Sequence, residues 1–417
     1  MGICFTNAKL VQLEPPLVAE GSLRVEEGVI AELGESVSPA EGDEIIDCQG
    51  AVVMPGLVNG HTHLYSALAA GMPSPPREPK NFHEILELVW WRLDRAHSLE
   101  SVMVSGQVGA LSALRCGTTT LIDHHASPAA IEGSLTHLQN GIAQVGCRGV
   151  LCYEVTDRNA PDEAERGLAE NVRYAEACAE SRQFAAMIGA HASFTLEESS
   201  LAACVEVANR LQLGVHIHVA EDPVDEQITR EKFGVGLLDR FEKHGLLDVP
   251  NTIFAHCTHL DQSQIDRLEA LNNTIRLAHN PNSNMNNGVG YTPVAKWQQT
   301  PLLGTDGIGA DMWREARTAQ FKSNDAGLPL GFGDPLKMIS QSAQFASHAL
   351  RRQLGVLEKG AAADLVVTSY TPATPLDATN LAGHFLFAMG PEFVRHVMID
   401  GRWCLRDGEV ISCDERA

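Results

Sequence analysis

One stretch decides how this chain is interpreted: Met54-Pro-Gly-Leu-Val-Asn-Gly-His-Thr-His63, in which two histidines stand one residue apart. Side chains two residues apart on a β-strand project from the same face. The apolar run before Pro55 and Gly56 predicts a buried strand that ends just before or at this pair. Two imidazoles side by side at a strand end can bind a metal from one direction, although two surface loop histidines would give the same motif.

Eight apolar runs alternate with longer stretches of helical spacing, which predicts repeated β/α units and a parallel sheet. The runs lie at residues 52–54, 118–123, 149–154, 184–190, 214–219, 252–255, 274–278 and 301–304. Eight such units are what a closed barrel requires. A doubly wound open sheet is the competing architecture, but a glycine-rich phosphate loop does not follow the first strand. We therefore predict an α/β fold with a (β/α)8 TIM-like barrel.

Each of these runs ends in polar residues. Active sites of β/α barrels lie at the C-terminal ends of the strands, so we expect these side chains to converge. They are His61 and His63, Asp123 to His125, Glu154, His191, His218 with Glu221, His256, His279 with Asn280, and Asp306.

Both ends of the chain have the pattern of short strands separated by turns. Asp400 and Gly401 form a strong hairpin-turn signal between two apolar runs. We expect a small β-sandwich domain formed by both termini, from residues 1–54 and 355–417, beside a metal-dependent catalytic barrel at residues 55–354.

The insertion after the first strand predicts a helix held over the barrel mouth. Asn81, with Glu84 three residues later, resembles a capping box. Apolar residues with helical spacing follow: Phe82, Ile85, Leu86, Val89 and Leu93. The same helix offers three candidate substrate contacts: Trp90, Trp91 and Arg92. Packing against the barrel wall explains either tryptophan equally well.

The charge balance disfavours some classes of partner. The chain has 31 basic and 53 acidic residues, and its net charge is −22. Such a surface repels phosphate backbones and anionic lipids, so neither nucleic acid nor a membrane is an expected partner. The apolar runs also stay well below the ~20 residues that a membrane-spanning helix needs.

The cysteines indicate a reducing compartment. None of the ten falls into a Cys-x-x-Cys pair, and several lie inside apolar runs, where they pack as small hydrophobic residues. The N-terminal residues lack the basic and long apolar regions of a signal peptide. We expect a cytoplasmic protein without structural disulfides.

Four strand-end residues could together hold a catalytic metal: His61, His63, His218 and Asp306. Hydrolytic zinc sites use histidine nitrogen and carboxylate oxygen ligands and keep one position for water, whose pKa the metal lowers to ~7. Glu221 follows His218 by three residues, a spacing that can let it reach past the metal toward a substrate. A His-x-x-Glu motif alone is weak evidence, and its place on the fifth predicted strand strengthens it.

Ordered motifs along the whole chain resemble the amidohydrolase superfamily, specifically its cytosine-deaminase-like aminohydrolases. They are Pro55-Gly-Leu-Val-Asn-Gly-His-Thr-His63, Gly117-Thr-Thr-Thr120, His216-Ile-His-Val-Ala-Glu221, Ala255-His-Cys-Thr-His259, His279-Asn-Pro-Asn-Ser-Asn284, Gly304-Thr-Asp-Gly307 and Gly360-Ala-Ala-Ala-Asp-Leu-Val366.

Within the superfamily the chain is most similar to the SsnA-type aminohydrolases. That closer match rests on Val89-Trp-Trp-Arg-Leu-Asp-Arg95, Asp123-His-His-Ala-Ser-Pro128, Asn284-Met-Asn-Asn287, Gly304-Thr-Asp-Gly-Ile-Gly-Ala-Asp-Met312 and Gly383-His-Phe-Leu-Phe387. Asp123-His-His125 also resembles the 8-oxoguanine deaminases.

The resemblance implies one divalent metal ion per chain, held by the four strand-end residues named above. Zinc is the expected metal, and iron or manganese would suit the same ligands. The resemblance also implies catalytic roles. Asp306 would take a proton from the metal-bound water, Glu221 would protonate a ring nitrogen, and His256 would orient the hydroxide.

Substrate contacts are less well defined. His191 matches a substrate-contacting position of the family, and Asn284 lies in one of the matched motifs. His124 and His125 have nearly equal claims to face the barrel mouth, and we take His125 as the candidate.

Two absences from the sequence narrow the chemistry. The chain has no lysine between Lys80 and Lys232, which removes the carboxylated lysine that bridges the metals of binuclear superfamily members. The unrelated zinc deaminases need a Cys-x-x-Cys motif, which this sequence also lacks.

These observations favour hydrolytic deamination of a small nitrogen heterocycle, purine- or pterin-like, with release of ammonia. Displacement of chloride or an alkylamine from a triazine-type ring is the runner-up. A catalytically silent binding protein on the same fold would be expected to have lost ligands, yet every ligand is present. The expected partner is a small heterocyclic substrate, and a homodimer is the commonest assembly.

Overall fold

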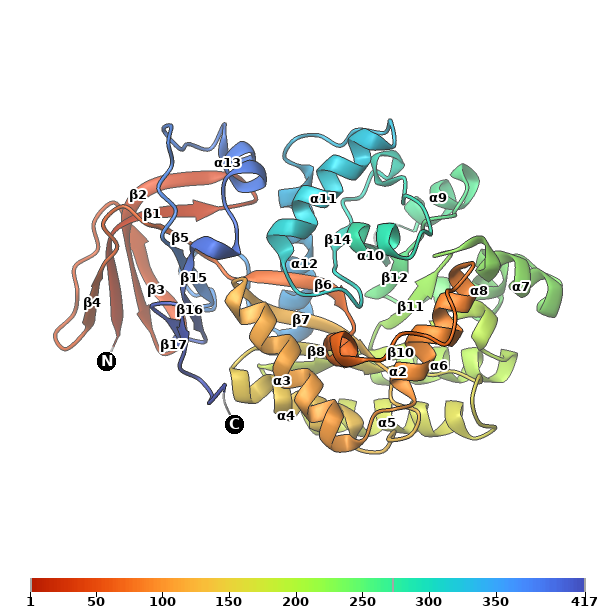
Figure 1. Cartoon of the computed structure of the whole chain (residues 1–417). Coiled ribbons are helices and arrows are strands. Elements are labelled where there is room, and N and C mark those ends of the chain that lie inside the picture. Colours follow the sequence, from red (N-terminus) through yellow and green to blue (C-terminus); the bar gives the residue numbers. More distant parts are fainter. Residues whose placement is uncertain (1, 272–273, 416–417) are drawn as a thin grey trace.

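Parallel strands surrounded by helices form the larger part of the molecule, in a computed structural model that describes residues 2–271 and 274–415 (Figure 1). One sheet contains β6 (Leu57–Thr62), β7 (Thr118–His125), β8 (Arg148–Tyr153) and β9 (Phe184–Ala186). The other contains β10 (Ile188–Ala192), β11 (Val215–Val219), β12 (Thr252–His256), β13 (Ile275–His279) and β14 (Leu302–Leu303). Isolated bridges outside the named strands connect the two sheets, from Val155 to Ala190 and from Thr62 to Asp306.

The apolar runs in the sequence follow from the burial of these strands. β7, β8 and β11 are buried along their whole length. Parallel strands covered on both faces have continuous apolar sequences rather than alternating ones. The predicted mixed α/β fold, built from β/α units, is confirmed.

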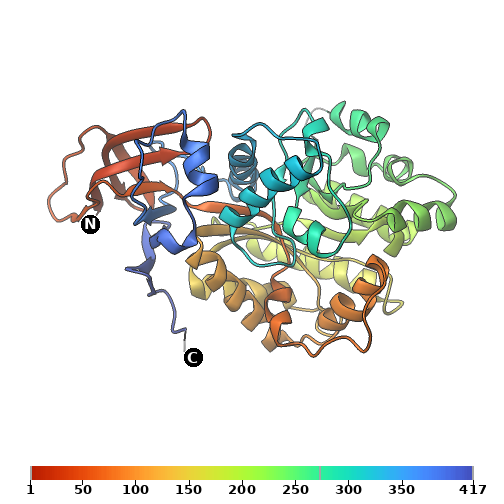
Figure 2. The ribbon, with the colours of Figure 1, turned by 45° about the horizontal axis from the view of Figure 1, so that its top comes forward.

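Helices connect the strands and pack around them (Figure 2). They are α3 (Leu99–Arg115), α4 (Ser134–Val145), α5 (Glu163–Cys178), α6 (Glu198–Leu211), α7 (Pro223–Phe233), α8 (Leu237–Lys243), α9 (Gln262–Glu269), α10 (Pro281–Asn286), α11 (Met312–Asp325), α12 (Asp334–Leu350) and α13 (Leu381–Phe387). Aspartates begin several of them. Asp261, for example, caps α9 in a capping box with Gln264. Within the part of the chain that the structure describes, no helix has the length and apolar character needed to cross a membrane.

The prediction that residues 52–54 form the first strand of the barrel is wrong. Residues Val52–Pro55 form β5, which pairs with β1 (Ile3–Gln12) and β15 (Leu365–Thr368) outside the parallel array, and the array begins instead at β6. Gly56 links the two sheets. A larger residue would not fit at this position, because a Cβ atom there would lie 2.3 Å from Thr119 Oγ1. The sequence shows one apolar stretch at this point because both strands are buried.

Strands from both ends of the chain share one nine-stranded sheet. Besides β1, β5 and β15 it contains β2 (Leu17–Glu26), β3 (Val29–Gly34), β4 (Glu44–Asp47), β16 (Val394–Ile399), β17 (Arg402–Arg406) and β18 (Glu409–Val410). Figure 1 shows the red N-terminal and blue C-terminal strands together on one side of the molecule. Asp400 and Gly401 form the predicted hairpin turn between β16 and β17, both with positive φ.

The insertion after β6 is helical where the apolar spacing predicts it. It consists of η1 (Leu64–Gly71), α1 (Phe82–Ile85), η2 (Leu86–Trp90) and α2 (Trp91–Asp94). Only half of the predicted capping box forms. Asn81 Oδ1 accepts from the Glu84 backbone N–H at 2.9 Å, but the Glu84 carboxylate accepts from the Lys80 N–H at 2.7 Å.

A buried ion pair fastens the parallel strands to the terminal sheet. Arg148, at the start of β8, donates to both oxygens of Asp364 at 2.7 and 3.0 Å and to Asp400 at 3.1 Å. The side chains of Arg148 and Asp364 are only 2% and 3% exposed. Such a bidentate pair fixes the orientation of both groups, and removal of one partner leaves a buried charge uncompensated.

We predict that Asp364→Ala lowers the free energy of unfolding by about 3–5 kcal/mol, because Arg148 stays buried without its bidentate partner. Denaturant unfolding followed by circular dichroism measures this loss. The control is Glu44→Ala, which removes an exposed ion pair with Arg406 and should cost about 1 kcal/mol or less. Equal losses in the two variants would contradict the account.

Candidate metal centre

Four side chains at the carboxyl ends of the parallel strands converge on one point. His61 lies on β6, His63 directly follows it, His218 lies on β11, and Asp306 follows β14. The Nε2 atom of His63 lies 3.1 Å from that of His218 and 3.0 Å from Asp306 Oδ1. His61 Nε2 lies 3.2 Å from the same Asp306 oxygen. The structure thus brings together the four residues that the sequence selects as ligands, and all are buried.

The hydrogen bonds made by the Nδ1 atoms of two of these imidazoles indicate whether a cation would fit between their Nε2 atoms. His63 Nδ1 lies 2.5 Å from the His124 carbonyl oxygen, and His218 Nδ1 lies 2.9 Å from the His191 carbonyl oxygen. A carbonyl only accepts, so both Nδ1 atoms carry the proton and the neutral rings point their Nε2 lone pairs at each other. Two lone pairs and a carboxylate oxygen at about 3 Å repel one another unless a cation lies between them. This donor set fits a divalent metal.

A proton takes that place when the metal is absent. Burial alone would lower the pKa of His63, but the Asp306 carboxylate outweighs it and raises this pKa to about 9. Burial lowers the pKa of His61 to about 3 and that of His218 well below its usual range. Those two rings are therefore neutral, which is the form in which a histidine binds a metal.

The backbone around the centre is strained. Asp306, His256 and Ala220 all have positive φ, at 52°, 72° and 46°. Left-handed conformations of residues other than glycine are uncommon and concentrate at functional sites. Asp306 is held in place by β6, because its N–H donates to the His61 carbonyl at 2.9 Å and its carbonyl accepts from His63 N–H at 3.2 Å.

Glu221 and His256 lie beside the ligand cluster. Glu221 Oε2 lies 3.7 Å from His256 Nε2, and its other oxygen lies 3.5 Å from Asn287 Nδ2. His256 Nδ1 lies 2.8 Å from the Asn284 side-chain oxygen, an acceptor, so Nδ1 donates and Nε2 is left to face the site. That buried Nε2 atom has no hydrogen-bond partner within the described ranges.

The two acidic residues of the centre have opposite pKa shifts. Burial, together with the negative charge of Asp306, raises the pKa of Glu221 well above its usual range. Burial would also raise the pKa of Asp306, but hydrogen bonds with His61 and His63 hold it well below its usual range. These opposite shifts favour the protonated form of Glu221 and the ionised form of Asp306, a division that suits acid–base catalysis.

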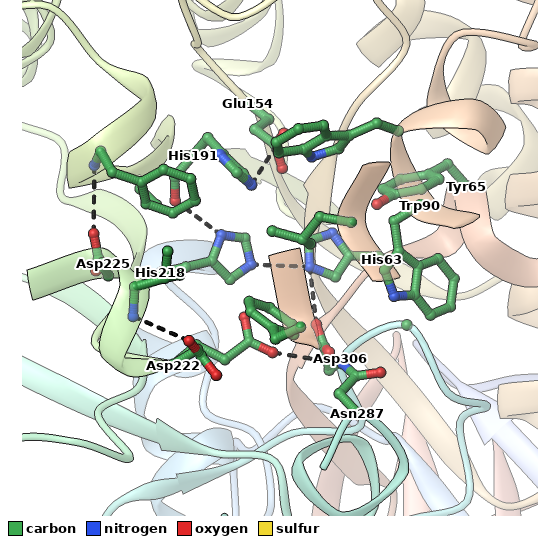
Figure 3. Close-up of a pocket in the computed structure, with 18 residues that line it drawn as sticks. His63, Tyr65, Trp90, Glu154, His191, His218, Asp222, Asp225, Asn287 and Asp306 are labelled. Atoms are coloured by element: carbon green, nitrogen blue, oxygen red, sulfur yellow. Dashed lines mark hydrogen bonds and ion pairs between the residues drawn. The ribbon is translucent and has the colours of Figure 1, made fainter. Parts of the chain in front are cut away.

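A pocket opens above these residues, with about 660 Å³ of free space including its mouth (Figure 3). Aromatic side chains form much of its wall: Tyr65, Phe82, Trp90, Trp91 and Phe194. Its polar lining comprises His63, Glu154, His191, His218, Glu221, Asp222, Asp225, Asn287 and Asp306. An apolar aromatic wall with a few convergent polar groups is typical of small-molecule sites.

The candidate substrate contacts divide into two groups. Trp90, Trp91 and His191 line the pocket, whereas Arg92, His125 and Asn284 do not. Arg92 lies against the Leu88 carbonyl of its own helix at 3.4 Å. His125 is fully buried and bonds to Ser127 Oγ at 2.9 Å, and Asn284 supports His256 as described above.

His124, and not the predicted His125, lies beside the ligand cluster. The ring centroid of His124 lies 4.7 Å from that of His218 and 5.4 Å from that of His63. His125 packs instead against Tyr65 and Tyr153. Alternate residues of a strand face opposite sides, so only one of two consecutive histidines can face the ligand cluster.

The family model of the amidohydrolases matches residues 52–404. This chain belongs to the amidohydrolase family. It is 26% identical over 414 residues to the 5'-deoxyadenosine deaminase of Methanothermobacter thermautotrophicus, an alignment that covers 96% of this chain and 92% of that protein. It is 28% identical over 418 residues to the 5-methylthioadenosine/S-adenosylhomocysteine deaminase of Desulforudis audaxviator, with coverage of 95% and 91%.

A solved structure shows the same fold with a metal. The adenosine deaminase of Xanthomonas campestris with bound zinc superposes with a TM-score of 0.84 at 22% identity, over 99% of this chain and 95% of that one. At this identity the likeness establishes the fold. Together with the His and Asp cluster of this amidohydrolase, it supports a site for a divalent metal.

Sequence reasoning missed a buried ionic network on the pocket wall. Arg158 donates to Glu154 and to Asp94, both at 2.6 Å, and its guanidinium lies 5.2 Å from the Trp91 ring centroid. Burial would raise the pKa of Glu154, but His191, Arg158 and His124 together hold it well below its usual range. The sequence predicts that Glu154 lies at the end of a strand, but it gives no indication that Glu154 shares an arginine with Asp94.

We predict that His61→Ala weakens binding of a divalent metal by more than about 100-fold, because second-sphere changes alone cost 10–100-fold and this one removes a ligand. Elemental analysis after dialysis against a metal buffer measures the retained metal. His137→Ala, on the outer helix α4, is the control and should retain it. Unchanged metal content in His61→Ala would overturn the ligand assignment.

Proposed function

We propose that this amidohydrolase catalyses hydrolytic deamination of a small nitrogen heterocycle, purine- or pterin-like, with release of ammonia. The observation that carries the proposal is the buried Glu221 carboxyl, whose pKa is raised well above its usual range, beside His256 and the ligand cluster. Membership of the amidohydrolase family and two deaminases at 26% and 28% identity over nearly the whole chain support it.

One zinc ion per chain is the proposed cofactor, held by His61, His63, His218 and Asp306. When bound, it supplies activation of water at neutral pH. The same ligand types also suit iron or manganese.

The protein's own residues supply the proton transfers. Glu221 carries a proton in its buried position and donates it to a ring nitrogen, which makes the neighbouring carbon easier to attack. Asp306 is ionised and accepts a proton from the attacking water. His256, with Nε2 directed at the same space, orients that water, and Asn287 holds Glu221 in position.

The wall of the pocket favours a flat, uncharged or cationic ring. Aromatic faces bind planar rings by stacking and by edge contacts. Among the described residues that line the pocket, none is a lysine or an arginine, and several are acidic. A phosphorylated or carboxylated substrate would therefore lack a counter-charge.

We also propose that the parallel strands close into one (β/α)8 barrel and that the terminal sheet forms a separate β-sandwich domain. The bridges from Val155 to Ala190 and from Thr62 to Asp306 support closure. We place the domain boundaries at residues 55/56 and 354/355, the first moved by one residue from 54/55 because Pro55 still pairs in the terminal sheet. The mouth of this barrel then carries the metal centre.

We predict that metal-loaded protein, screened against aminopurines, aminopterins and aminopyrimidines, releases ammonia and leaves the ring intact with an oxo group in place of the amino group. A coupled ammonia assay and mass spectrometry of the product measure this. Hydrolysis of a chlorinated or alkylamino triazine without any ammonia release would favour the runner-up reaction. Binding of a heterocycle without hydrolysis would contradict the proposal that the protein is an enzyme.

We predict that Glu221→Gln lowers kcat by roughly 10²–10⁴-fold while metal content and ligand affinity are kept, because the amide preserves shape but cannot deliver the proton. Steady-state kinetics and calorimetric binding measure the two quantities. Glu226→Gln, in the same segment but outside the pocket lining, is the control and should have normal kcat. Near-normal kcat in Glu221→Gln would assign the proton transfer to another group.

A further inference from the structure

The protonation state of His191 follows from its neighbour Thr195. The Thr195 hydroxyl donates its hydrogen to the Ala192 carbonyl at 3.1 Å, so its oxygen can only accept from His191 Nδ1, which lies 2.7 Å away. The Nδ1 atom therefore carries the proton of the neutral ring. His191 Nε2 is left as a hydrogen-bond acceptor on the pocket wall.

Glu154 places a second acceptor beside this nitrogen. Its Oε1 atom lies 3.9 Å from His191 Nε2, too far for a hydrogen bond between them. Arg158 donates to the same oxygen at 2.6 Å, and His124 Nδ1 lies 3.3 Å from Oε2. A carboxylate offers about four lone-pair positions, so Glu154 can still accept from a ligand.

The pair lies on the far side of the ligand cluster from the proton donor. Figure 3 shows Glu154 and His191 on one side of His63 and His218, with Asp306 and Asn287 on the other side. A ring whose reacting carbon lies at the cluster therefore directs a different edge toward Glu154 and His191.

We propose that Glu154 and His191 form an acceptor pair that determines substrate specificity by binding an amino group on the non-reacting edge of the heterocycle. This inference rests on the proposed function and narrows it to rings that carry at least one amino group besides the one removed. Arg158 acts as a positioning residue, because it holds the Glu154 carboxylate and contacts the pocket only through its partners.

An oxo group in that position is rejected for a physical reason. A carbonyl oxygen there would meet two acceptors and find no donor, and His191 Nε2 and the free lone pairs of Glu154 would stay unpaired. Sites built to pair a particular substrate group discriminate strongly against an analogue that lacks it, because buried polar groups are left unpaired.

Matched compounds that differ by one group test the inference. Each of three pairs replaces one amino group by an oxo group and keeps another amino group as the leaving group: 2,6-diaminopurine and isoguanine, 2,4-diaminopteridine and 4-amino-2-oxopteridine, melamine and ammeline. Calorimetric Kd and kcat/KM are measured for each compound with the metal-loaded full-length protein. We expect the wild type to favour the diamino or triamino member of at least one pair by about 100-fold or more.

Glu154→Gln should reduce or reverse this preference, because an amide NH₂ group can donate to the oxo member. The amino-to-oxo ratio should fall to about ten-fold or lower, mainly through Kd and KM rather than kcat. His191→Phe keeps an aromatic ring without the acceptor and should reduce the same ratio. The control is Glu163→Gln, a buried glutamate that pairs with Asn159 outside the pocket lining, and it should keep the wild-type ratio.

The outcomes separate this inference from the proposed function. Preferential binding of the amino members without ammonia release would support the acceptor pair and overturn the deaminase proposal. Ammonia release with equal kcat/KM for both members of every pair would overturn the acceptor pair alone. A wild-type preference for the oxo members, failure of all six compounds to bind, or an unchanged ratio in folded Glu154→Gln would each overturn the inference.

Discussion

Two backbone carbonyls fix the chemistry of the centre. The carbonyls of His124 and His191 accept the Nδ1 protons of His63 and His218, and this directs both Nε2 lone pairs at one point. These carbonyls belong to β7 and β10, so the register of the parallel strands sets the distance between the two nitrogens. The strained backbone at Asp306 then adds a carboxylate to the same point. A cation is the group that makes this convergence of donors favourable.

The same arrangement shifts the pKa values of two neighbouring carboxyl groups in opposite directions. Imidazole nitrogens beside Asp306 lower its pKa and favour its ionised form, whereas burial beside that negative charge raises the pKa of Glu221 and favours its protonated form. Neither role follows from residue type alone. Each follows from the neighbours that the strand ends bring to the residue.

Much of the centre could be predicted from the sequence because its residues lie at or directly after the ends of strands. His61 and His63 follow a buried run, and His218 with Glu221 ends another, so their convergence follows from the expected β/α order. The boundary between β5 and β6 could not be predicted, since both strands are buried and only Gly56 separates them. The orientation of His124 against His125 depends on the phase of β7, which the sequence of a strand buried along its whole length does not reveal. The contact between Asp94, Arg158 and Glu154 joins an insertion to a distant strand end, and no spacing in the sequence encodes it.

The central claim is that one divalent cation lies where these side chains converge. Anomalous diffraction from crystals of the zinc-loaded protein, measured across the zinc absorption edge, tests it most directly. The account predicts a single strong peak bonded to Nε2 of His61, His63 and His218 and to Asp306 Oδ1, at about 2.0–2.2 Å from each atom. Two peaks of comparable height, or a peak among Glu154, His124 and His191 in place of this one, would contradict it.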